Sequence, residues 1–274
     1  MWVKKSEITQ LSSDIRKVID GQMIDIRDNR EGVWCTLKND IHTLAALKSE
    51  QANSLKQERD LLADKLADIS HQLKTPLTSM MLMSDLLENA PSDKQTEFIS
   101  NIKIELTHME WLVSALLKMA KLDADAIKFS TENVKVGEIV ALALESLQIL
   151  LEVKNQSVEI SNEIELFCDK RWTVEALTNI IKNASEYSPA NSIIYVESGM
   201  NPICKWISVT DSGAGISKSK IAKLFKRYKG TRSDQGYGIG LPLSLAIMQS
   251  QNGDIEVDGG GGNCGATFTL KFFK

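Results

Sequence analysis

The chain has 274 residues, of which 43% are hydrophobic, so it can bury a large core and form one large or two modest domains. Its net charge of -4 comes without a concentrated basic run, which argues against a protein dedicated to binding nucleic acid or an anionic membrane. The cysteines are scattered without a C-x-x-C pair, which favours free thiols in a reducing cytosol over a disulfide framework or a zinc site.

The amino-terminal segment predicts two helices joined by an irregular connector. Apolar residues from Ile8 to Ile19 recur at helical spacing, Gly21 interrupts them, and a second helix is expected after Gly32. The longest apolar stretches of the chain are too short to cross a bilayer as helices. The start, Met1 to Lys5, has the aromatic and basic character of a segment just inside a membrane. We therefore expect a cytoplasmic chain whose parent protein is anchored upstream, at the inner face of the plasma membrane.

A heptad pattern follows, in which apolar residues alternate steps of four and three, as in the seam of a helix bundle. The pattern consists of Leu62, Leu66, Ile69, Leu73, Pro76, Met80, Met83 and Leu87. His71 lies two residues from both Ile69 and Leu73, about 200° around the helix from each. The histidine is therefore expected to face outward from the bundle.

The heptad helix is predicted to pair with a second helix. Ala90 to Asp93 breaks the first helix, and a second apolar stripe extends from Phe98 to Ala120. The two helices predict an antiparallel hairpin, and the exposed stripe suits pairing of two hairpins into a four-helix bundle. We expect a homodimer, with linker helices in residues 1–56 and the dimerisation hairpin in residues 57–123.

The remainder predicts an interdomain linker, residues 124–133, and an α+β domain, residues 134–274. Alternating apolar residues predict a strand over 158–166, and an amphipathic pattern predicts a helix over 172–187. Short strands are expected at 193–196 and 206–209, and a hairpin around the glycines of 259–262 closes the domain. Because strands and helices do not alternate regularly, we expect an α+β sandwich.

Two groups of residues carry the chemistry, and the first begins at His71, in the sequence His-Gln-Leu-Lys-Thr-Pro-Leu. An exposed neutral imidazole is a competent nucleophile toward phosphorus near neutral pH. Pro76 cannot donate to the carbonyl of Gln72, so the helix is expected to bend or loosen one turn after His71. Taken alone, these residues also fit a surface histidine beside an ordinary proline kink.

The second group lies in the carboxy-terminal domain. Glu175, Asn179 and Asn183 repeat every four residues, which places three polar side chains on one helical face. Asp211 follows a predicted strand and enters a turn with Gly213 and Gly215, whose glycines permit close approach of the backbone. The helical face, taken alone, also fits a solvated surface.

A glycine-rich segment completes this second group. Gly236, Gly238 and Gly240 lead into Leu241 and a predicted helix, where backbone N–H groups can receive phosphate oxygens. The segment fails the dinucleotide fingerprint, because Leu241 stands where its third glycine would fall, and no G-K-[ST] ending is present.

Together and in this order, the motifs resemble the phospho-acceptor and catalytic regions of bacterial sensor histidine kinases over about three quarters of the chain. The resemblance implies a carboxy-terminal ATP-binding domain of the gyrase, chaperone and histidine-kinase type, with ATP and Mg²⁺ as cofactors. It implies that His71 accepts the phosphoryl group and passes it to a response-regulator receiver domain. Thr75 matches the position that orients water for dephosphorylating that partner. The helices of residues 1–56 resemble signal-relay linkers, although a plain helical hairpin fits them equally well.

Within the ATP site, the resemblance assigns Asn183 to magnesium, Tyr187 to the side of the nucleotide, and Asp211 to the exocyclic amino group of adenine. Lys229 and Arg232, in a short lid segment, are candidates for phosphate contacts. The other residues for which the resemblance implies nucleotide binding are Asn179, Gly213, Gly215, Gly236, Gly238, Gly240 and Leu241.

Departures from the family pattern keep two alternatives open. Gln72 replaces a commoner acidic residue, and Glu186 stands where many relatives carry a basic residue. The lid is also short. These three departures fit the first alternative, a degenerate ATP-binding module.

The other alternative is an ATP-hydrolysing clamp of the gyrase and chaperone type, in which a glutamate one turn before the magnesium asparagine activates water. Here that position is Asn179, which cannot act as a base, so phosphoryl transfer to a side chain is favoured.

Overall fold

The computed structural model describes residues 4–19, 32–88, 90–124, 126–225, 238–260 and 265–274. The chain divides into two compact units, Met1–Ser70 and His71–Lys274. The first unit contains α1 (Lys5–Ile19) and the greater part of α2 (Val33–Leu87), on which Leu11 and Cys35 respectively are buried. Among the helices of the described residues, none is both long and apolar enough to cross a membrane.

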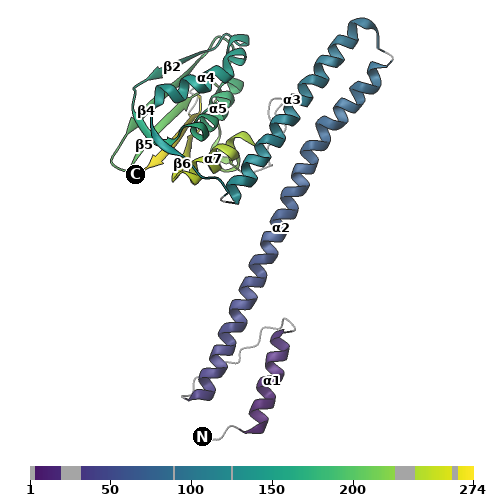
Figure 1. Cartoon of the computed structure of the whole chain (residues 1–274), viewed down its shortest axis with the longest axis vertical. Helices are drawn as coiled ribbons and strands as arrows, with labels where there is room; N and C mark the ends of the chain where they lie inside the picture. Colours follow the sequence, from purple (N-terminus) through teal and green to yellow (C-terminus); the bar gives the residue numbers. More distant parts are fainter. Residues whose placement is uncertain (1–3, 20–31, 89, 125, 226–237, 261–264) are drawn as a thin grey trace. The chain divides into compact units, whose positions relative to one another are not determined.

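The two long helices of the predicted hairpin are α2 and α3 (Ser92–Asp123) (Figure 1). Pro76 is buried inside α2, which does not end there but continues to Leu87. The hydroxyl of the preceding residue, Thr75, donates to the carbonyl of His71 at 3.3 Å. The helix thus continues past the proline, although Pro76 has no N–H to donate to the carbonyl of Gln72.

The predicted stripe of α3 is partly exposed in the single chain, and the helix is buried on another face. Leu106 and Val113 belong to that stripe, yet they are 53% and 43% exposed. The residues that α3 buries lie in its second half, where it contacts α7 (Gly240–Ser250); they are Leu112, Ala115, Met119 and Leu122. The stripe is open because a bundle seam needs partner helices to cover it, whereas the carboxy-terminal domain covers a different face of α3.

The carboxy-terminal domain is built on a five-stranded sheet in the order β2-β4-β5-β7-β6. The strands are β2 (Ser157–Ser161), β4 (Ile193–Met200), β5 (Cys204–Thr210), β6 (Gly253–Asp258) and β7 (Thr267–Phe273). β2 runs parallel to β4, and the other pairs are antiparallel. Burial alternates along β7, as expected for strands that pack one face on a core. The closing hairpin of β6 and β7 is confirmed.

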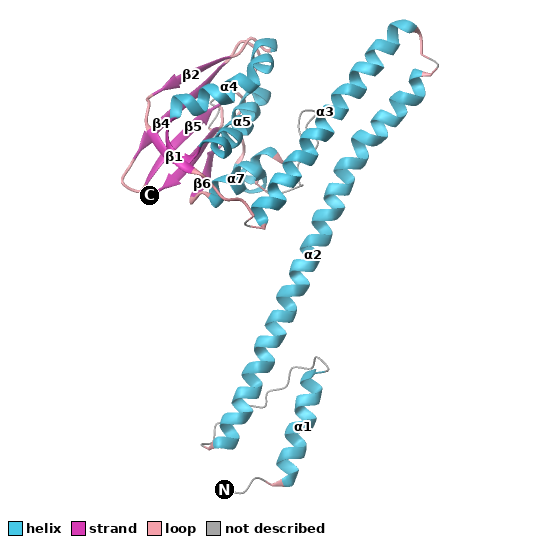
Figure 2. Cartoon of the chain, in the orientation of Figure 1, coloured by secondary structure: helices cyan, strands magenta, loops and turns pink. Residues whose placement is uncertain are grey.

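A layer of helices lies against one face of this sheet (Figure 2). It contains α4 (Val136–Val153), α5 (Lys170–Tyr187) and α7, and a short helix, α6 (Lys218–Leu224), follows β5. Fully buried aliphatic side chains from α4, α5 and α7, among them Ile139, Ile180 and Leu243, join Phe268 of β7 in one core. The predicted fold class, a helical region followed by an α+β sandwich, is confirmed.

One predicted strand is wrong. The apolar alternation over 158–166 belongs to two strands, β2 and β3 (Glu165–Asp169), separated by a turn in which Asn162 has a φ of 60°. β3 pairs not with the main sheet but with β1 (Thr131–Lys135), antiparallel, with Thr131 opposite Asp169. Asn can adopt this left-handed conformation at little cost, so the chain reverses there without a glycine.

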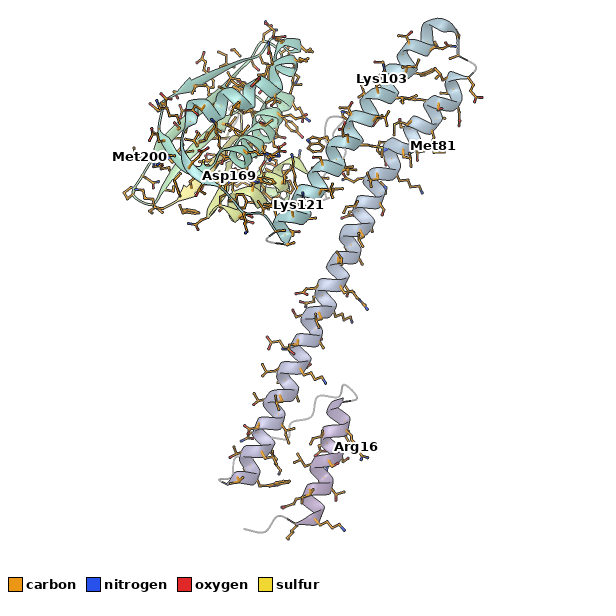
Figure 3. The ribbon with its side chains drawn as sticks, viewed as in Figure 1. Arg16, Met81, Lys103, Lys121, Asp169 and Met200 are labelled. Carbon is orange, nitrogen blue, oxygen red and sulfur yellow. The ribbon has the colours of Figure 1, made fainter. Side chains whose placement is uncertain are left out.

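The segment before β1 is attached to the start of α5. Asp169, labelled in Figure 3, caps α5 by accepting from the backbone N–H of Trp172 at 3.1 Å, and it accepts from Ser130 at 2.8 Å. Phe129 lies against Trp172, with ring centroids 6.0 Å apart. Part of the predicted linker is thereby fixed to the carboxy-terminal domain.

Candidate functional site

The predicted phospho-acceptor, His71, is exposed on α2, as its position relative to the heptad seam indicated. Pro76 and Met80 are buried on the seam side of the same helix. Gln72 and Thr75 are half-buried, so the residues that follow the histidine are less accessible than the histidine itself. The imidazole is free to meet a reactant that approaches from solvent.

The predicted nucleotide residues converge from two helices and a loop. Asn179, on α5, is only 8% exposed, and its Nδ2 has no hydrogen-bond partner among the described residues. Gly240 begins α7 directly beside it, because a Cβ added to that glycine would lie 3.6 Å from Asn179 Cγ. A buried amide N–H without an acceptor costs free energy, so this atom fits a site that a ligand completes.

Asp211 lies where β5 ends, and it is 6% exposed. Its Oδ1 accepts from the backbone N–H of Gly213 at 2.8 Å and from that of Ala266 at 3.1 Å. Among the described residues no donor reaches Oδ2, which leaves this oxygen to accept from a ligand. Burial raises the pKa of Asp211, and the two backbone hydrogen bonds oppose that rise.

The turn after Asp211 leaves no room for side chains. A Cβ at Gly213 would lie 2.6 Å from the carbonyl oxygen of Tyr187, and one at Gly265 would collide with the backbone of Asp211. Gly215 has a φ of 75°, in the left-handed region. These glycines bring the end of α5, the Asp211 turn and the start of β7 together, and Tyr187, 56% exposed, stands at their edge.

The second glycine segment is described in part. Gly238 has a φ of 65°, and α7 begins two residues later at Gly240, with no side chain capping its first N–H groups. Those groups are free to receive an anion. Leu241 packs against the core. Gly236 and the predicted lid residues Lys229 and Arg232 lie outside the described residues.

The polar residues predicted on one face of α5 have different surroundings. Glu175 pairs with Lys118 of α3 at 2.8 Å. Lys182 lies 5.2 Å from the ring centroid of Trp111, also on α3, and 3.9 Å from the carboxylate of Glu186. Glu175 and Lys182 thus contact the helical hairpin, and Asn179 and the half-buried Asn183 remain candidates for nucleotide binding. Burial raises the pKa of Glu186, against the effect of the neighbouring lysines.

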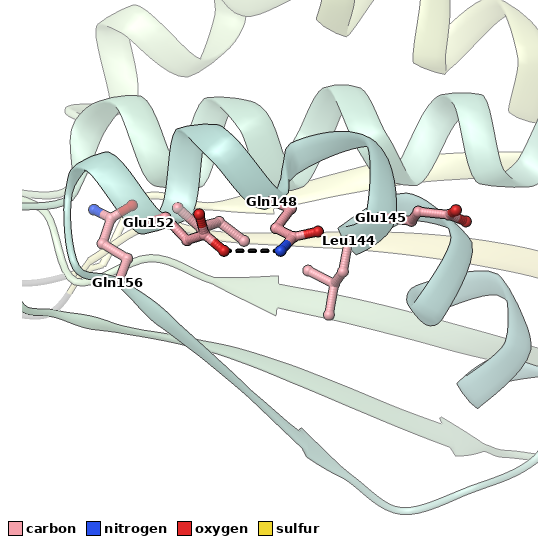
Figure 4. Close-up of a pocket in the computed structure, with 6 residues that line it drawn as sticks. Leu144, Glu145, Gln148, Glu152 and Gln156 are labelled. Carbon is pink, nitrogen blue, oxygen red and sulfur yellow. Dashed lines mark hydrogen bonds between the residues drawn. The ribbon is translucent and has the colours of Figure 1, made fainter.

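Two residues beside the site had no sequence signal. Lys154 and Gln156 contact the end of α5 through hydrogen bonds, mostly to backbone atoms, and such contacts leave no motif. Ser188, next to Tyr187, contacts the Asp211 turn. Gln156 also lines a shallow depression along α4, with Gln148 donating to Glu152 at 2.8 Å (Figure 4). The depression carries no predicted site residue. Within the described ranges, no group of three or more His, Cys, Asp or Glu side chains is placed to hold a metal ion.

Two family models match the chain. Residues 168–274 match the histidine kinase-, DNA gyrase B- and HSP90-like ATPases, and residues 62–125 match the His Kinase A phospho-acceptor domain. The chain therefore belongs to the two-component sensor histidine kinases, whose phospho-acceptor and ATP-binding domains it carries in that order. The resemblance drawn from its motifs is confirmed, and the ATPase domain implies that the chain binds ATP.

Curated relatives agree with this class. The chain is 28% identical over 270 residues to the heme sensor protein HssS of Staphylococcus saprophyticus, an alignment that covers 97% of the chain and 57% of the relative. It is 30% identical over 223 residues to the sensor histidine kinase WalK of Bacillus subtilis, covering 76% of the chain and 36% of the relative. The chain thus spans little more than half the length of HssS, and less of WalK.

Solved structures show the same fold. The histidine kinase AdeS of Acinetobacter baumannii matches with a TM-score of 0.63 at 21% identity, over 74% of this chain and 97% of that one. The histidine kinase ThkA, in a complex with the response regulator protein TrrA, matches with a TM-score of 0.64 at 19% identity, over 83% of this chain and 66% of that one.

Proposed function

We propose that the chain is an ATP-dependent protein-histidine kinase that phosphorylates His71 and passes the phosphoryl group to an aspartate of a response-regulator receiver domain. One observation carries the proposal. The chain combines an exposed histidine, in a phospho-acceptor domain, with the buried carboxylate of Asp211. The Oδ2 atom of this carboxylate is open to a ligand, beside glycines that leave no room for side chains. The ThkA structure, solved with a response regulator, supports the choice of partner.

The chemistry requires one nucleophilic displacement at each transfer. A neutral nitrogen of His71 attacks the γ-phosphorus, the new N–P bond forms, and the P–O bond breaks with its electron pair on ADP. The other ring nitrogen then releases its proton to water. In the second transfer a carboxylate oxygen of the regulator attacks phosphorus, the N–P bond breaks, and the imidazole takes up a proton. Thr75 is assigned to orienting the water that later removes the phosphoryl group from the regulator.

The residues assigned to the nucleotide have distinct roles. Asp211 Oδ2 accepts from the adenine amino group, while the first N–H groups of α7, from Gly240 onward, receive phosphate oxygens. Asn179 contributes its otherwise unpartnered amide, and Asn183 is assigned to hold Mg²⁺. Bound with the nucleotide, the ion offsets phosphate charge. Asn183 is half-buried on the same face of α5 as Asn179, four residues further on, which supports that assignment.

Phosphate analysis tests the proposal. The wild-type chain is incubated with Mg²⁺ and γ-labelled ATP beside His71→Gln and Asn183→Asp, with His108→Gln as the matched control, because His108 is an exposed histidine of α3. We expect acid-labile, alkali-stable label on the wild type and the control, and none on the other two variants. Release of free phosphate without labelled protein would support an ATP-hydrolysing clamp instead, and nucleotide binding without any label would support a degenerate module.

A further inference from the structure

The carboxyl end of α5 is closed by a lysine from another element. The last carbonyls of a helix have no partners within it and carry partial negative charge. Lys154, which follows α4, donates from Nζ to the carbonyl oxygens of Ser185 at 2.7 Å, Glu186 at 3.0 Å and Ser188 at 3.4 Å. A single ammonium thus satisfies carbonyls from the last turn of α5 and from the residue after it.

Gln156 holds the same stretch of chain. Its Nε2 lies within hydrogen-bond distance of the carbonyl oxygens of Ser185, Ser188 and Pro189, at 3.2, 3.3 and 2.9 Å. Its Oε1 accepts from the Ser185 hydroxyl at 2.5 Å, and the residue is only 9% exposed. Between them, Lys154 and Gln156 fix the backbone on both sides of Tyr187.

The turn that carries these two side chains is itself fixed to the same segment. Asn155 and Asn191 have φ values of 50° and 60°, and Asn155 Nδ2 donates to Asn191 Oδ1 at 2.7 Å. The backbone N–H of Asn191 donates to the carbonyl of Lys154 at 2.9 Å. The backbone of Lys154 is therefore held in place, and only its side chain has to be ordered when Nζ meets the end of α5.

This segment touches the adenine side of the candidate site. The Ser188 hydroxyl accepts from the backbone N–H of Ser212 at 3.0 Å, next to Asp211. The carbonyl of Tyr187 faces Gly213, at a distance that leaves no room for a methyl group. Movement of residues 185–188 would therefore displace the turn whose N–H groups orient the Asp211 carboxylate.

We propose that Lys154 is a positioning residue for adenine-nucleotide binding: by closing the end of α5 it sets the Tyr187–Ser188 backbone, and through it the Asp211 turn. The inference rests on the proposed ATP site and names a residue that acts on it from outside. An ammonium group has three N–H donors, and here three backbone carbonyls receive them. The lysine therefore has no donor left for a phosphate group, and its effect must reach the nucleotide through the adenine side.

The affinities for ATP and AMP, measured by competition against a fluorescent ATP analogue, test the proposal. We expect Lys154→Met to raise both Kd values about tenfold and by the same factor, because the loss lies at the base. Lys170→Met is the matched control, since it breaks a surface pair with Glu138 at the other end of α5, and its Kd values should not change. Lys154→Arg, which keeps the cation, should lose less affinity than Lys154→Met.

A second variant separates positioning from folding. Ser188→Ala removes only the acceptor for Ser212 N–H, so it should weaken both nucleotides while the melting temperature stays near that of the wild type. Unchanged affinity in Lys154→Met or in Ser188→Ala would overturn the positioning role. A loss for ATP without a loss for AMP would also overturn it and show a phosphate contact instead. A wild-type chain that binds neither nucleotide would overturn the proposed function, and the positioning role with it.

Discussion

At the scale of single residues, Asp211 combines its proposed role in nucleotide binding with a cost to stability. Its carboxyl is buried, and because the pKa is raised in the folded chain, folding favours the protonated form. The stability that the protonated Asp211 carboxyl provides is fully present below its pKa of about 3.9 in the unfolded chain. It is lost as the pH rises through the higher pKa in the folded chain. At neutral pH the ionised carboxylate is thus held at the expense of stability.

Asp211→Asn should therefore separate stability from binding. An asparagine can keep its oxygen toward Gly213 and Ala266, which places Nδ2, a donor, where Oδ2 is proposed to accept from the adenine amino group. We expect a melting temperature at pH 7 above that of the wild type, a difference that narrows toward pH 4, and a Kd for ATP raised roughly 10- to 100-fold. Thermal melts across this pH range and a nucleotide titration check both. A variant that melts lower at pH 7, or binds ATP normally, would contradict the assignment.

At the scale of elements, α3 meets the ATP-binding domain through apolar and charged contacts of unequal weight. Leu112 is 1% exposed, whereas the side chains of Lys118 and Glu175 are 32% and 30% exposed. Removal of a buried leucine side chain costs the transfer free energy plus a cavity, but a solvent-accessible ion pair contributes little. The apolar contacts therefore decide the stability of this packing.

The comparison of Leu112→Ala with Lys118→Met tests this difference. The first should lower the free energy of unfolding by about 2–4 kcal/mol, and the second by less than about 1 kcal/mol. Urea denaturation followed by circular dichroism measures both values on the same chain. Equal losses would mean that the Lys118–Glu175 pair contributes as much as the leucine to holding α3, which would contradict this prediction.

Elements with a strong pattern were predictable from the sequence, and elements defined by distant partners were not. The helix over Lys170–Tyr187 and the β6–β7 hairpin follow from periodicity and glycine placement. The apolar alternation through Asn162 concealed a turn, because asparagine adopts the left-handed conformation without a glycine signal. β1 is short and mostly exposed, so only its pairing with β3 defines it.

Some residues of the candidate site were likewise predictable from the sequence, and others were not. Asn179, Asp211 and Gly213 belong to motifs; in the structure Asn179 lies beside Gly240, and Asp211 accepts from the backbone N–H of Gly213. Lys154 and Gln156 act chiefly on backbone carbonyls some 30 residues further along the chain, and such contacts place no constraint on neighbouring residue types. Only the folded chain brings these partners together.

At the scale of the whole molecule, the exposed apolar residues of α2 support a homodimer. Leu62 and Leu66 are each 56% exposed in the single chain, although they belong to the heptad seam. Leu62→Glu combined with Leu66→Glu should place like charges in the dimer interface and shift the chain to monomers. Light scattering after gel filtration measures the mass, with the exposed, off-seam Thr78→Glu as control. A double variant that stays dimeric would show that the dimer interface does not include this part of α2.

The antiparallel pair of β1 and β3 decides where a protease can release the ATP-binding domain intact. A fragment that starts at Val134 loses most of β1, and β3 is left with unpaired N–H and C=O groups along its edge. Such an edge is a template for aggregation. A cut before Ala126 preserves the strand together with the Ser130–Asp169 hydrogen bond and the Phe129–Trp172 contact. The position of cleavage, within a few residues, thus separates a soluble fragment from one prone to precipitate.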